Sequence, residues 1–415
     1  MDRLHKIGFS KLTSVEKALE KMFSIVKIRP SIKVDTINSL NYTIADDIKS
    51  NIAVPHFDRS AMDGYAVIAK DTFGASLINP KYIKEAGKIE IGEVSNITLN
   101  NSEAVRISTG AQIPNGADAV IKIEDTEIDH STIKIYNSIV PGRNISKKGE
   151  DTKKGEVIIE KGTQLKPEHI ALLCSQGIDK TIVREPPKVS IFATGDELVE
   201  VGNILENNQI YNSNSPMISN LVKLYGGDVI KVETVKDNKD LIQTKLLESL
   251  SLSDIIIFSG GTSVGTKDYL PEIIKENATI IIHGIAMRPG SPILIAHKDD
   301  ILIFCLPGTP VAAYLGFLKF VGPAIRKLLG SKRLDLRENC LAIINDDVPV
   351  SSIGYIHYLR VKIKKEENKF IAHPIRLKGS GMISSLTNSD GIVEISPSQE
   401  GLKKGDKVSI KLHPK

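Results

Sequence analysis

The chain has 415 residues, of which 41% are hydrophobic and 25% charged, ordinary proportions for a soluble globular protein of about three domains. Its 54 Lys and Arg residues exceed its 50 Asp and Glu residues by only four, aromatic residues make up 5%, and Trp is absent. This mild charge and the scarcity of aromatic side chains argue against nucleic acid as a partner, because binding it needs a concentrated basic face.

The sequence also argues against export and membrane insertion. No apolar h-region follows Met1, so we expect no secretory signal. No apolar stretch reaches the roughly 18 residues that a spanning helix needs. Cys174, Cys305 and Cys340 are odd in number and far apart, which fits neither a disulfide framework nor a zinc site. We therefore expect a cytoplasmic protein, not bound to a membrane, whose thiols are reduced and mostly buried.

The first part of the chain predicts one helix and a small lobe made mostly of β-structure. Residues 13–28 have helical apolar periodicity, and Thr13 and Glu16 have the spacing of a capping box. Residues 42–45 have the pattern of a short strand. From residue 51 to about residue 140, short β-like runs are separated by Gly, Pro and Asn, and these indicate the lobe.

Strands and helices alternate after Pro186-Pro187, which marks a domain boundary. The strands are expected at 188–193, 228–235, 254–259, 279–283 and 301–305, and the helices at 168–175 before the boundary and at 215–225, 239–250, 270–276 and 310–329 after it. Alternation of this kind predicts a mostly parallel sheet. Short strands at 356–363 and 407–412 predict a small C-terminal β-barrel or sandwich. The fold class is therefore α/β plus β, in a multidomain chain.

Three of the predicted strands run into sharp polar or glycine-rich turns. The turns are Ala193-Thr-Gly-Asp-Glu197, Ser259-Gly-Gly-Thr-Ser-Val-Gly-Thr-Lys-Asp268 and Leu306-Pro-Gly-Thr-Pro310. Because parallel strands end at one edge of their sheet, we expect these turns to meet at one site. Backbone N–H groups there would face an anion.

Two familiar motifs come close to the second turn but do not fit it. Gly261-Thr-Ser263-Val-Gly265 matches the nucleophile elbow of serine hydrolases, yet no helix is expected directly after the serine and no His stands in a triad context. Thr266-Lys267 reverses the Lys-Ser/Thr order of a P-loop, whose Lys must reach the phosphates from its own position. A hydrolase and a P-loop nucleotidase are both poorly supported.

Acidic residues surround the expected anion site. Glu197, Asp237 and Asp268 each lie at or just past the end of a predicted strand. Any one of them alone would be read as a helix cap or an exposed turn residue. Three on the same sheet edge instead suit Mg²⁺, which takes one or two carboxylates together with phosphate oxygens from a substrate.

A second cluster lies in the N-terminal half, in Pro55-His-Phe-Asp58-Arg-Ser-Ala-Met-Asp63-Gly-Tyr-Ala-Val67. Turn chemistry at Asp63-Gly64 and packing of the apolar residues would explain it as structure alone. Two acids in an apolar segment without regular periodicity instead indicate a functional loop. Thr109 and Asp151 lie in two further polar turns of the same region.

Six motifs in this order resemble the MoeA-type molybdopterin molybdenumtransferases, relatives of the gephyrin E domain. They are Phe57-Asp-Arg-Ser-Ala-Met-Asp-Gly-Tyr-Ala-Val67, Ser108-Thr-Gly110, Lys148-Gly-Glu-Asp151, Ala193-Thr-Gly-Asp-Glu-Leu198, Ser259-Gly-Gly-Thr-Ser-Val-Gly-Thr-Lys-Asp-Tyr269 and Leu306-Pro-Gly-Thr-Pro310. The resemblance spans nearly the whole chain. It implies insertion of molybdenum from molybdate into adenylylated molybdopterin, with Mg²⁺-dependent release of AMP.

The resemblance also implies an elongated homodimer of four-domain chains. The expected domains are a dimerisation lobe (1–50 with 147–186), an inserted β lobe (51–146), a molybdopterin-binding α/β domain (187–332) and a C-terminal β domain (333–415). The active cleft would lie between the α/β domain of one subunit and the inserted lobe of the other. The adenylyltransferase and the acceptor apoenzymes are candidate partners.

Site roles carried over from the family fall into four groups. Asp58, Thr109 and Asp151 would reach across the dimer to the catalytic cleft. Glu197 would line the pterin or phosphate pocket, and Asp237 and Asp268 would hold Mg²⁺. The cofactor-binding turns would be formed by Gly195, Gly260, Gly261, Ser263, Gly265, Pro307 and Gly308. Arg288, Arg360 and Ser380 match positions that bind molybdate or shape its pocket.

Three departures make the expected oxyanion site less basic than is usual in the family. Ser291 stands where the family often has a second Lys, and Ala312 where it often has Ser. Ser146 stands where an Arg is common. Two other functions stay open on the sequence: adenylyl transfer to molybdopterin, performed by a related α/β fold, and a dimeric binding scaffold without chemistry.

Overall fold

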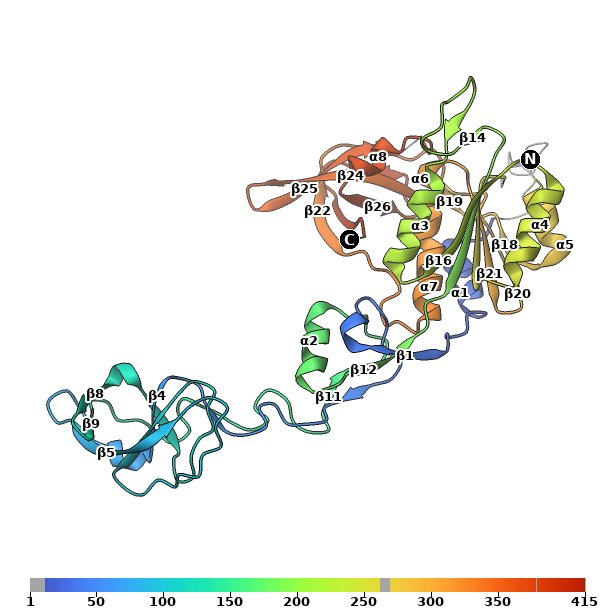
Figure 1. Ribbon diagram of the computed structural model, residues 1–415. Helices are drawn as coiled ribbons and strands as arrows, with labels where there is room; N and C mark the ends of the chain where they lie inside the picture. The colour runs from blue at the N-terminus through green and yellow to red at the C-terminus, as the bar shows by residue number, and fades with distance from the viewer. Residues whose placement is uncertain (1–11, 262–268, 378, 415) are drawn as a thin grey trace.

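The computed structural model describes residues 12–261, 269–377 and 379–414. The chain is elongated: a β lobe lies at one end, a small connecting region follows, and the α/β domain and the C-terminal β domain lie together at the other end (Figure 1). In the described part of the chain, no helix has both the length and the apolar character needed to cross a membrane.

The first helix, α1 (Val15–Phe23), packs Val15, Ala18 and Met22 into the core of the distant α/β domain. Its N-cap is Ser14, whose hydroxyl accepts from the N–H of Lys17 at 3.3 Å. The expected cap at Thr13 and the expected continuation to residue 28 are both wrong. The segment after the helix follows a different path, because the guanidinium of Arg29 binds Glu185 at 2.7 Å and Asp254 at 2.5 Å. Pro30 also disfavours a helical conformation at Arg29.

The connecting region is built from two segments far apart in sequence. Its elements are β1 (Ser31–Asp35), η2 (Thr36–Asn38), β2 (Ile48–Lys49), β11 (Val157–Ile159), α2 (Pro167–Ser175) and β12 (Lys180–Arg184). Strand β1 pairs antiparallel with β12, and β2 with β11. Residues 42–45 form isolated bridges, Thr43 to Gln164 and Ile44 to Val183, instead of the expected strand. The inserted lobe is therefore held at its base by two antiparallel pairs.

The inserted lobe is mostly β-structure, as expected. Its elements are β3 (Arg59–Ser60), β4 (Gly64–Val67), η3 (Ala69–Thr72), β5 (Lys81–Ile89), β6 (Glu103–Ile107), β7 (Ala119–Lys122), η4 (Ile123–Asp125), β8 (Thr126–Asp129), β9 (Thr132–Ile135) and β10 (Ile145–Ser146). Six strands form one sheet in the order β7-β4-β6-β5-β9-β8. The alternating side chains of β4 enter two small cores, with Tyr65 in one and Ala66 in the other.

The α/β domain has a six-stranded sheet in the order β16-β13-β17-β21-β20-β18. The strands are β13 (Lys188–Thr194), β16 (Asp228–Val235), β17 (Ile255–Ser259), β18 (Thr279–His283), β20 (Leu294–Lys298) and β21 (Ile301–Leu306). The first four in sheet order are parallel, and β20 and β18 add an antiparallel edge. The mostly parallel sheet is thus confirmed, although strand β20 was not expected.

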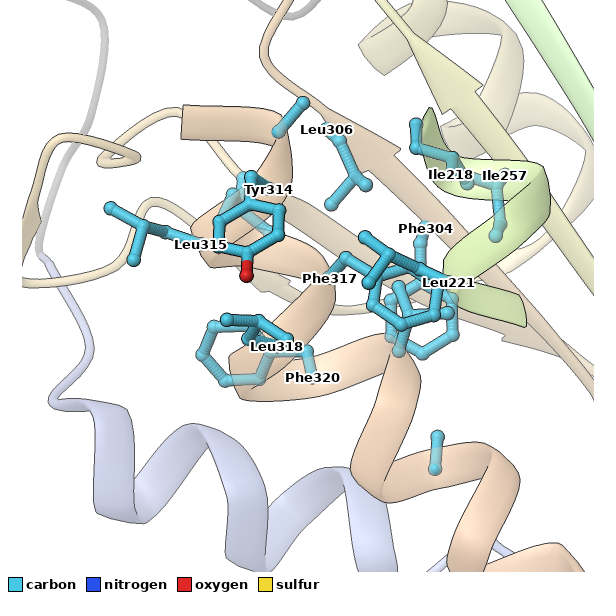
Figure 2. Close-up of a cluster of buried hydrophobic side chains, with 14 of the residues drawn as sticks. Ile218, Leu221, Ile257, Phe304, Leu306, Tyr314, Leu315, Phe317, Leu318 and Phe320 are labelled. Carbon is cyan, nitrogen blue, oxygen red and sulfur yellow. The ribbon is translucent and has the colours of Figure 1, made fainter. Parts of the chain in front are cut away.

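Helices cover both faces of this sheet (Figure 1). They are α3 (Asn214–Tyr225), α4 (Lys239–Leu250), α5 (Leu270–Asn277), α6 (Pro310–Gly316) and α7 (Gly322–Leu328), with a π-helix (Phe317–Val321) joining the last two. Helices α4 and α5 pack on one face, while α3, α6 and α7 pack on the other with α1. Figure 2 shows Phe317 beside Leu221 of α3 and Phe304 of the sheet, and Phe320 beside Leu318. A short strand pair, β14 (Leu198–Val199) with β15 (Ile210–Tyr211), projects from this domain.

The C-terminal domain is a closed five-stranded barrel. Its elements are β22 (Asn339–Ile344), β23 (Val348–Pro349), β24 (Ile356–Glu366), β25 (Lys369–Arg376), α8 (Ser384–Thr387), β26 (Gly391–Ile395), β27 (Gly401–Leu402) and β28 (Lys407–Leu412). The ring runs β24-β25-β22-β28-β26 and closes through the β24–β26 pairing. Strand β19 (Met287–Arg288) of the α/β domain pairs in parallel with β24. The predicted fold class, α/β plus β in several domains, is confirmed.

Candidate functional site

Three strand-end turns of the α/β domain come together at one edge of the sheet. The N–H of Gly260, after β17, donates to the carbonyl of Leu306 at 3.0 Å. A Cβ built on Gly260 would lie 2.4 Å from the carbonyl oxygen of Thr194, and one on Gly308 would lie 3.4 Å from the Cα of Gly260. Only glycine fits at position 260, which also has a φ of +107°, whereas a Cβ at position 308 would make an ordinary van der Waals contact.

The glycines of these turns differ in whether their N–H groups form hydrogen bonds. Gly195 donates to Val235 at 3.2 Å and Gly260 donates to Leu306, so neither N–H is free to face an anion. The expectation of backbone donors is wrong for these two. Within the described residues, the N–H groups of Gly261 and Gly308 donate to no other residue. Among the four glycines, only the N–H groups of Gly261 and Gly308 are therefore left without a partner among the described residues.

Two buried polar side chains at this edge escaped the sequence reasoning. The Asn214 amide, at the start of α3, donates to Ser259 Oγ at 2.9 Å and to the Gly308 carbonyl at 2.8 Å, tying two turns together. Its Oδ1 atom and the Oγ1 atom of Thr194 are buried, and neither has a hydrogen-bond partner among the described residues. Thr194 and Asn214 are only 4% and 8% exposed. The two atoms lie beside the glycine turns, where they are available to hydrogen-bond a ligand.

The acids at the same edge form a looser group. The backbone N–H of Asp237, after β16, donates to Oδ1 of Asp196 at 3.2 Å. Glu197 is exposed, and its carboxylate bends back over Gly195, because a Cβ built there would lie 2.6 Å from Oε2. Asp196 had not been singled out from the sequence. The described residues contain no group of three or more His, Cys, Asp or Glu side chains suited to a metal ion.

Three expected site residues, Ser263, Gly265 and Asp268, lie outside the described residues, as does most of the second turn. Pro307 is described and buried in the third turn, directly before Gly308.

The expected oxyanion residues lie where the barrel meets the α/β domain. Arg288 on β19 stands opposite His357 of β24, and Arg360 follows three residues later, about 10 Å along the strand. Arg360 is fully buried, and Arg288 is partly exposed. The carbonyl of Ser380 accepts from the N–H of Val311 at 2.9 Å, at the start of α6. The barrel is therefore joined to the sheet-edge site through the turn that contains Gly308.

The acids of the inserted lobe lie far from this edge within one chain (Figure 1). The carboxylate of Asp58 accepts from the N–H of Lys148 at 2.8 Å and from Lys147 Nζ at 3.2 Å. These contacts, the Lys148 N–H first, hold the pKa of Asp58 below its usual value against a smaller opposing effect of burial. Asp58 is thus a carboxylate at neutral pH.

Thr109 lies in a turn of the inserted lobe, and Asp151 lies in a turn that follows the last strand of the lobe. The N–H of Thr109 donates to Oδ1 of Asp63 at 2.7 Å. Asp151 is exposed, and its N–H donates to the carbonyl of Val54 at 3.0 Å. Thr109 and Asp63 line a surface depression of about 360 Å³ with Lys122 and three other residues. Thr109 and Asp151 are exposed, and within the described residues neither bonds to the α/β domain or the barrel of the same chain.

Comparison with known proteins finds a family match for each of three regions of the chain. Residues 13–177 match the family described as "MoeA N-terminal region (domain I and II)", and residues 350–412 match "MoeA C-terminal region (domain IV)". Residues 190–327 match "Probable molybdopterin binding domain".

Individual relatives cover almost the whole chain. A molybdopterin molybdenumtransferase of Staphylococcus aureus is 36% identical over 397 residues, which cover 95% of this chain and 94% of the relative. A molybdopterin biosynthesis MoeA protein of Pyrococcus horikoshii has a solved structure that is 36% identical, with a TM-score of 0.82, covering 97% of this chain and 99% of that one. A second solved structure from that organism is 31% identical, with a TM-score of 0.84.

Proposed function

This chain belongs to the MoeA family of molybdopterin molybdenumtransferases, and we propose on that premise that it inserts molybdenum from molybdate into adenylylated molybdopterin and releases AMP. The observation that carries the proposal is the glycine-lined sheet edge with its two unpaired buried polar atoms, because that edge falls within the molybdopterin-binding match.

The sheet edge would bind the pterin and its pyrophosphate. Gly195 and Gly260 let the ligand approach the strand ends, and the N–H groups of Gly261 and Gly308 would donate to phosphate oxygens. The Thr194 hydroxyl and the Asn214 amide oxygen would take the remaining polar contacts, since neither atom has a partner among the described residues. Glu197 would line the same pocket, and Ser263, Gly265 and Pro307 would complete it.

The acidic side chains at this edge would bind Mg²⁺. Asp237 and Asp268 would hold it, and Asp196, which already accepts from the N–H of Asp237, fixes the turn. A magnesium ion needs only one or two carboxylates when substrate phosphates complete its coordination, so a larger acid cluster is not required. Bound there, the ion would neutralise charge on the pyrophosphate that is cleaved.

The oxyanion would bind where the barrel meets the α/β domain, with Arg288, Arg360 and Ser380 around it. Guanidinium and hydroxyl groups are suitable donors for a tetrahedral dianion. Ser291, Ala312 and Ser146 make this site less basic than in many relatives. Arg288 is therefore expected to contribute a large part of the affinity.

The remaining catalytic residues would come from a second subunit. Asp58 and Thr109 lie on the inserted lobe, which the connecting region holds far from the sheet edge of its own chain, and Asp151 follows the last strand of the lobe. In a homodimer, the lobe of one subunit would close the cleft of the other and place these groups beside the bond that breaks. We place this reaction in the cytoplasm, with the adenylyltransferase and the acceptor apoenzymes as partners.

One assay distinguishes this function from the alternatives. Purified protein is incubated with adenylylated molybdopterin, Mg²⁺ and molybdate, and AMP and the metal-containing cofactor are quantified. Release of AMP that depends on molybdate supports insertion. Adenylylation of molybdopterin from ATP would instead indicate an adenylyltransferase, and the absence of both reactions would indicate a scaffold.

A further inference from the structure

The guanidinium of Arg288 is held on two sides by one loop of the barrel. Its Cζ atom lies 4.1 Å from the ring centroid of Tyr355, and its Nη1 atom donates to Ser352 Oγ at 2.8 Å. Both partners belong to the loop between β23 and β24, although Arg288 itself belongs to the α/β domain. A domain different from its own therefore fixes the orientation of this side chain.

The loop is itself fixed by four hydrogen bonds. A ring nitrogen of His357, Nε2, lies 2.8 Å from the Ser352 carbonyl, and the Ser352 hydroxyl donates to the Ser351 carbonyl at 2.7 Å. The N–H of Gly354 donates to Pro397 at 2.8 Å, and that of Ile356 donates to Ala286 at 3.0 Å. Tyr355 is only 9% exposed. Rigid supports of this kind lower the entropy that Arg288 would lose when it binds a ligand.

The two contacts leave one edge of the guanidinium unused. Nη1 is engaged by Ser352 and one face is covered by Tyr355, whereas Nε and Nη2 donate to no other described residue. The Nε and Nη2 hydrogens point the same way and are spaced to meet two oxygens of one anion. A lysine at this position would offer no such edge, because its ammonium acts as a point charge.

We propose that Tyr355 and Ser352 are positioning residues that aim the Nε/Nη2 edge of Arg288 at the tetrahedral oxyanion substrate, so that Arg288 binds it through two parallel hydrogen bonds. The inference rests on the proposed function only in taking molybdate as the anion. It goes beyond that function by assigning two barrel residues that set the affinity for the oxyanion.

The alternative is that these contacts merely attach β19 to the barrel. An attachment role predicts that loss of either contact lowers stability and weakens both substrates together. A positioning role predicts a selective effect on the oxyanion. The chain supplies a conservative variant for each residue, since Tyr355→Phe keeps the ring and Ser352→Thr keeps the hydroxyl.

The test uses the full chain and measures molybdate binding by calorimetry, and the KM of each substrate in AMP release. Tyr355→Leu and Ser352→Ala are each expected to raise the Kd and KM for molybdate about tenfold, equivalent to about 1.4 kcal/mol. The kcat at saturating molybdate and the KM for adenylylated molybdopterin should not change. Tyr355→Phe and Ser352→Thr should restore the molybdate values. Phe370→Leu, at an exposed aromatic residue of the same barrel, is the control.

Three results would overturn the proposal: unchanged molybdate binding in Tyr355→Leu and Ser352→Ala, an equal rise in the KM of both substrates with a lowered Tm, or no molybdate binding to the unaltered chain. Failure of the proposed function is recognised separately. In that case the unaltered chain would bind molybdate and the variants would bind it more weakly, but no AMP would be released.

Discussion

The Lys319 ammonium lies 2.6 Å from Oε1 of Glu394, and this ion pair joins the π-helix of the α/β domain to strand β26 of the barrel. The Lys319 side chain is 9% exposed and that of Glu394 is 24% exposed. Burial lowers the pKa of Lys319 to about 8, although the attraction of Glu394 opposes the shift. Arg337 and Lys411 also lie within 4 Å of Glu394, so three cations share this carboxylate, and two of them are buried.

Loss of that carboxylate should loosen the junction between the two domains. Glu394→Gln would leave the Lys319 charge buried and unpaired, and breaking a buried pair in this way costs about 3 kcal/mol. Urea unfolding of the full chain, followed by hydrogen exchange of β24 and β26, would measure the loss. Asp300→Asn is the matched control, because its pair with Lys27 is exposed on both sides and should contribute nothing measurable. Equal effects of the two variants would contradict this account of the junction.

The same junction should be sensitive to acid. Burial raises the pKa of Asp335, but the hydrogen bond and charge of Arg337 outweigh burial and lower it from 3.8 to about 2. A carboxylate whose pKa is lower in the folded state contributes stability above its unfolded pKa, and the contribution disappears as the pH falls from about 4 to about 2. The shift corresponds to at most about 2 kcal/mol at neutral pH.

Asp335→Asn should therefore lower the unfolding midpoint at pH 7 and flatten its dependence on pH between about 4 and 2. Thermal unfolding across this pH range, compared with the unaltered chain, would measure both effects. An Asn variant whose midpoint falls with acid as steeply as that of the unaltered chain would contradict the assignment to Asp335.

The Asn214 side chain should contribute to the affinity for adenylylated molybdopterin. Asn214→Ala would leave the Gly308 carbonyl and the Ser259 hydroxyl without their donor and would release the turns from each other. We expect the Kd of adenylylated molybdopterin to rise about tenfold, because a lost buried hydrogen bond costs about 1–3 kcal/mol. Calorimetry would measure it. Asn220→Ala, which removes an exposed amide of the same helix bonded to Pro216, should leave the Kd unchanged.

Much of the fold could be predicted from the sequence because its signals are local. Apolar runs that alternate with helical segments identified β13, β16, β17 and β21. The meeting of the turns after β13, β17 and β21 followed from the expected parallel sheet. Strand β20 was missed, since its antiparallel position between β21 and β18 depends on pairing and not on pattern. The end of α1 was misplaced because the ion pairs of Arg29 with Glu185 and Asp254 are tertiary contacts.

The site was predicted less completely, for a related reason. Glycine turns and acids can be recognised in the sequence, whereas Asn214 and Thr194 stand out only when their burial and missing partners are known. Tyr355 and Ser352 could not be connected with Arg288 from the sequence, because the contact crosses from one domain to another.

Mixed dimers would show whether the molybdenum-inserting site is shared between two subunits. Asp58→Ala removes a lobe carboxylate and Asp237→Ala a sheet-edge carboxylate, so each variant alone should release no AMP. The two variants are coexpressed with different tags, and dimers that carry both tags are isolated.

In such a dimer, one cleft would contain both substitutions and the other neither. We expect molybdate-dependent AMP release at about half the rate of the unaltered dimer, since one of two sites is intact. Mixed dimers that stay inactive, although folded and able to bind molybdate, would contradict a site built from two subunits.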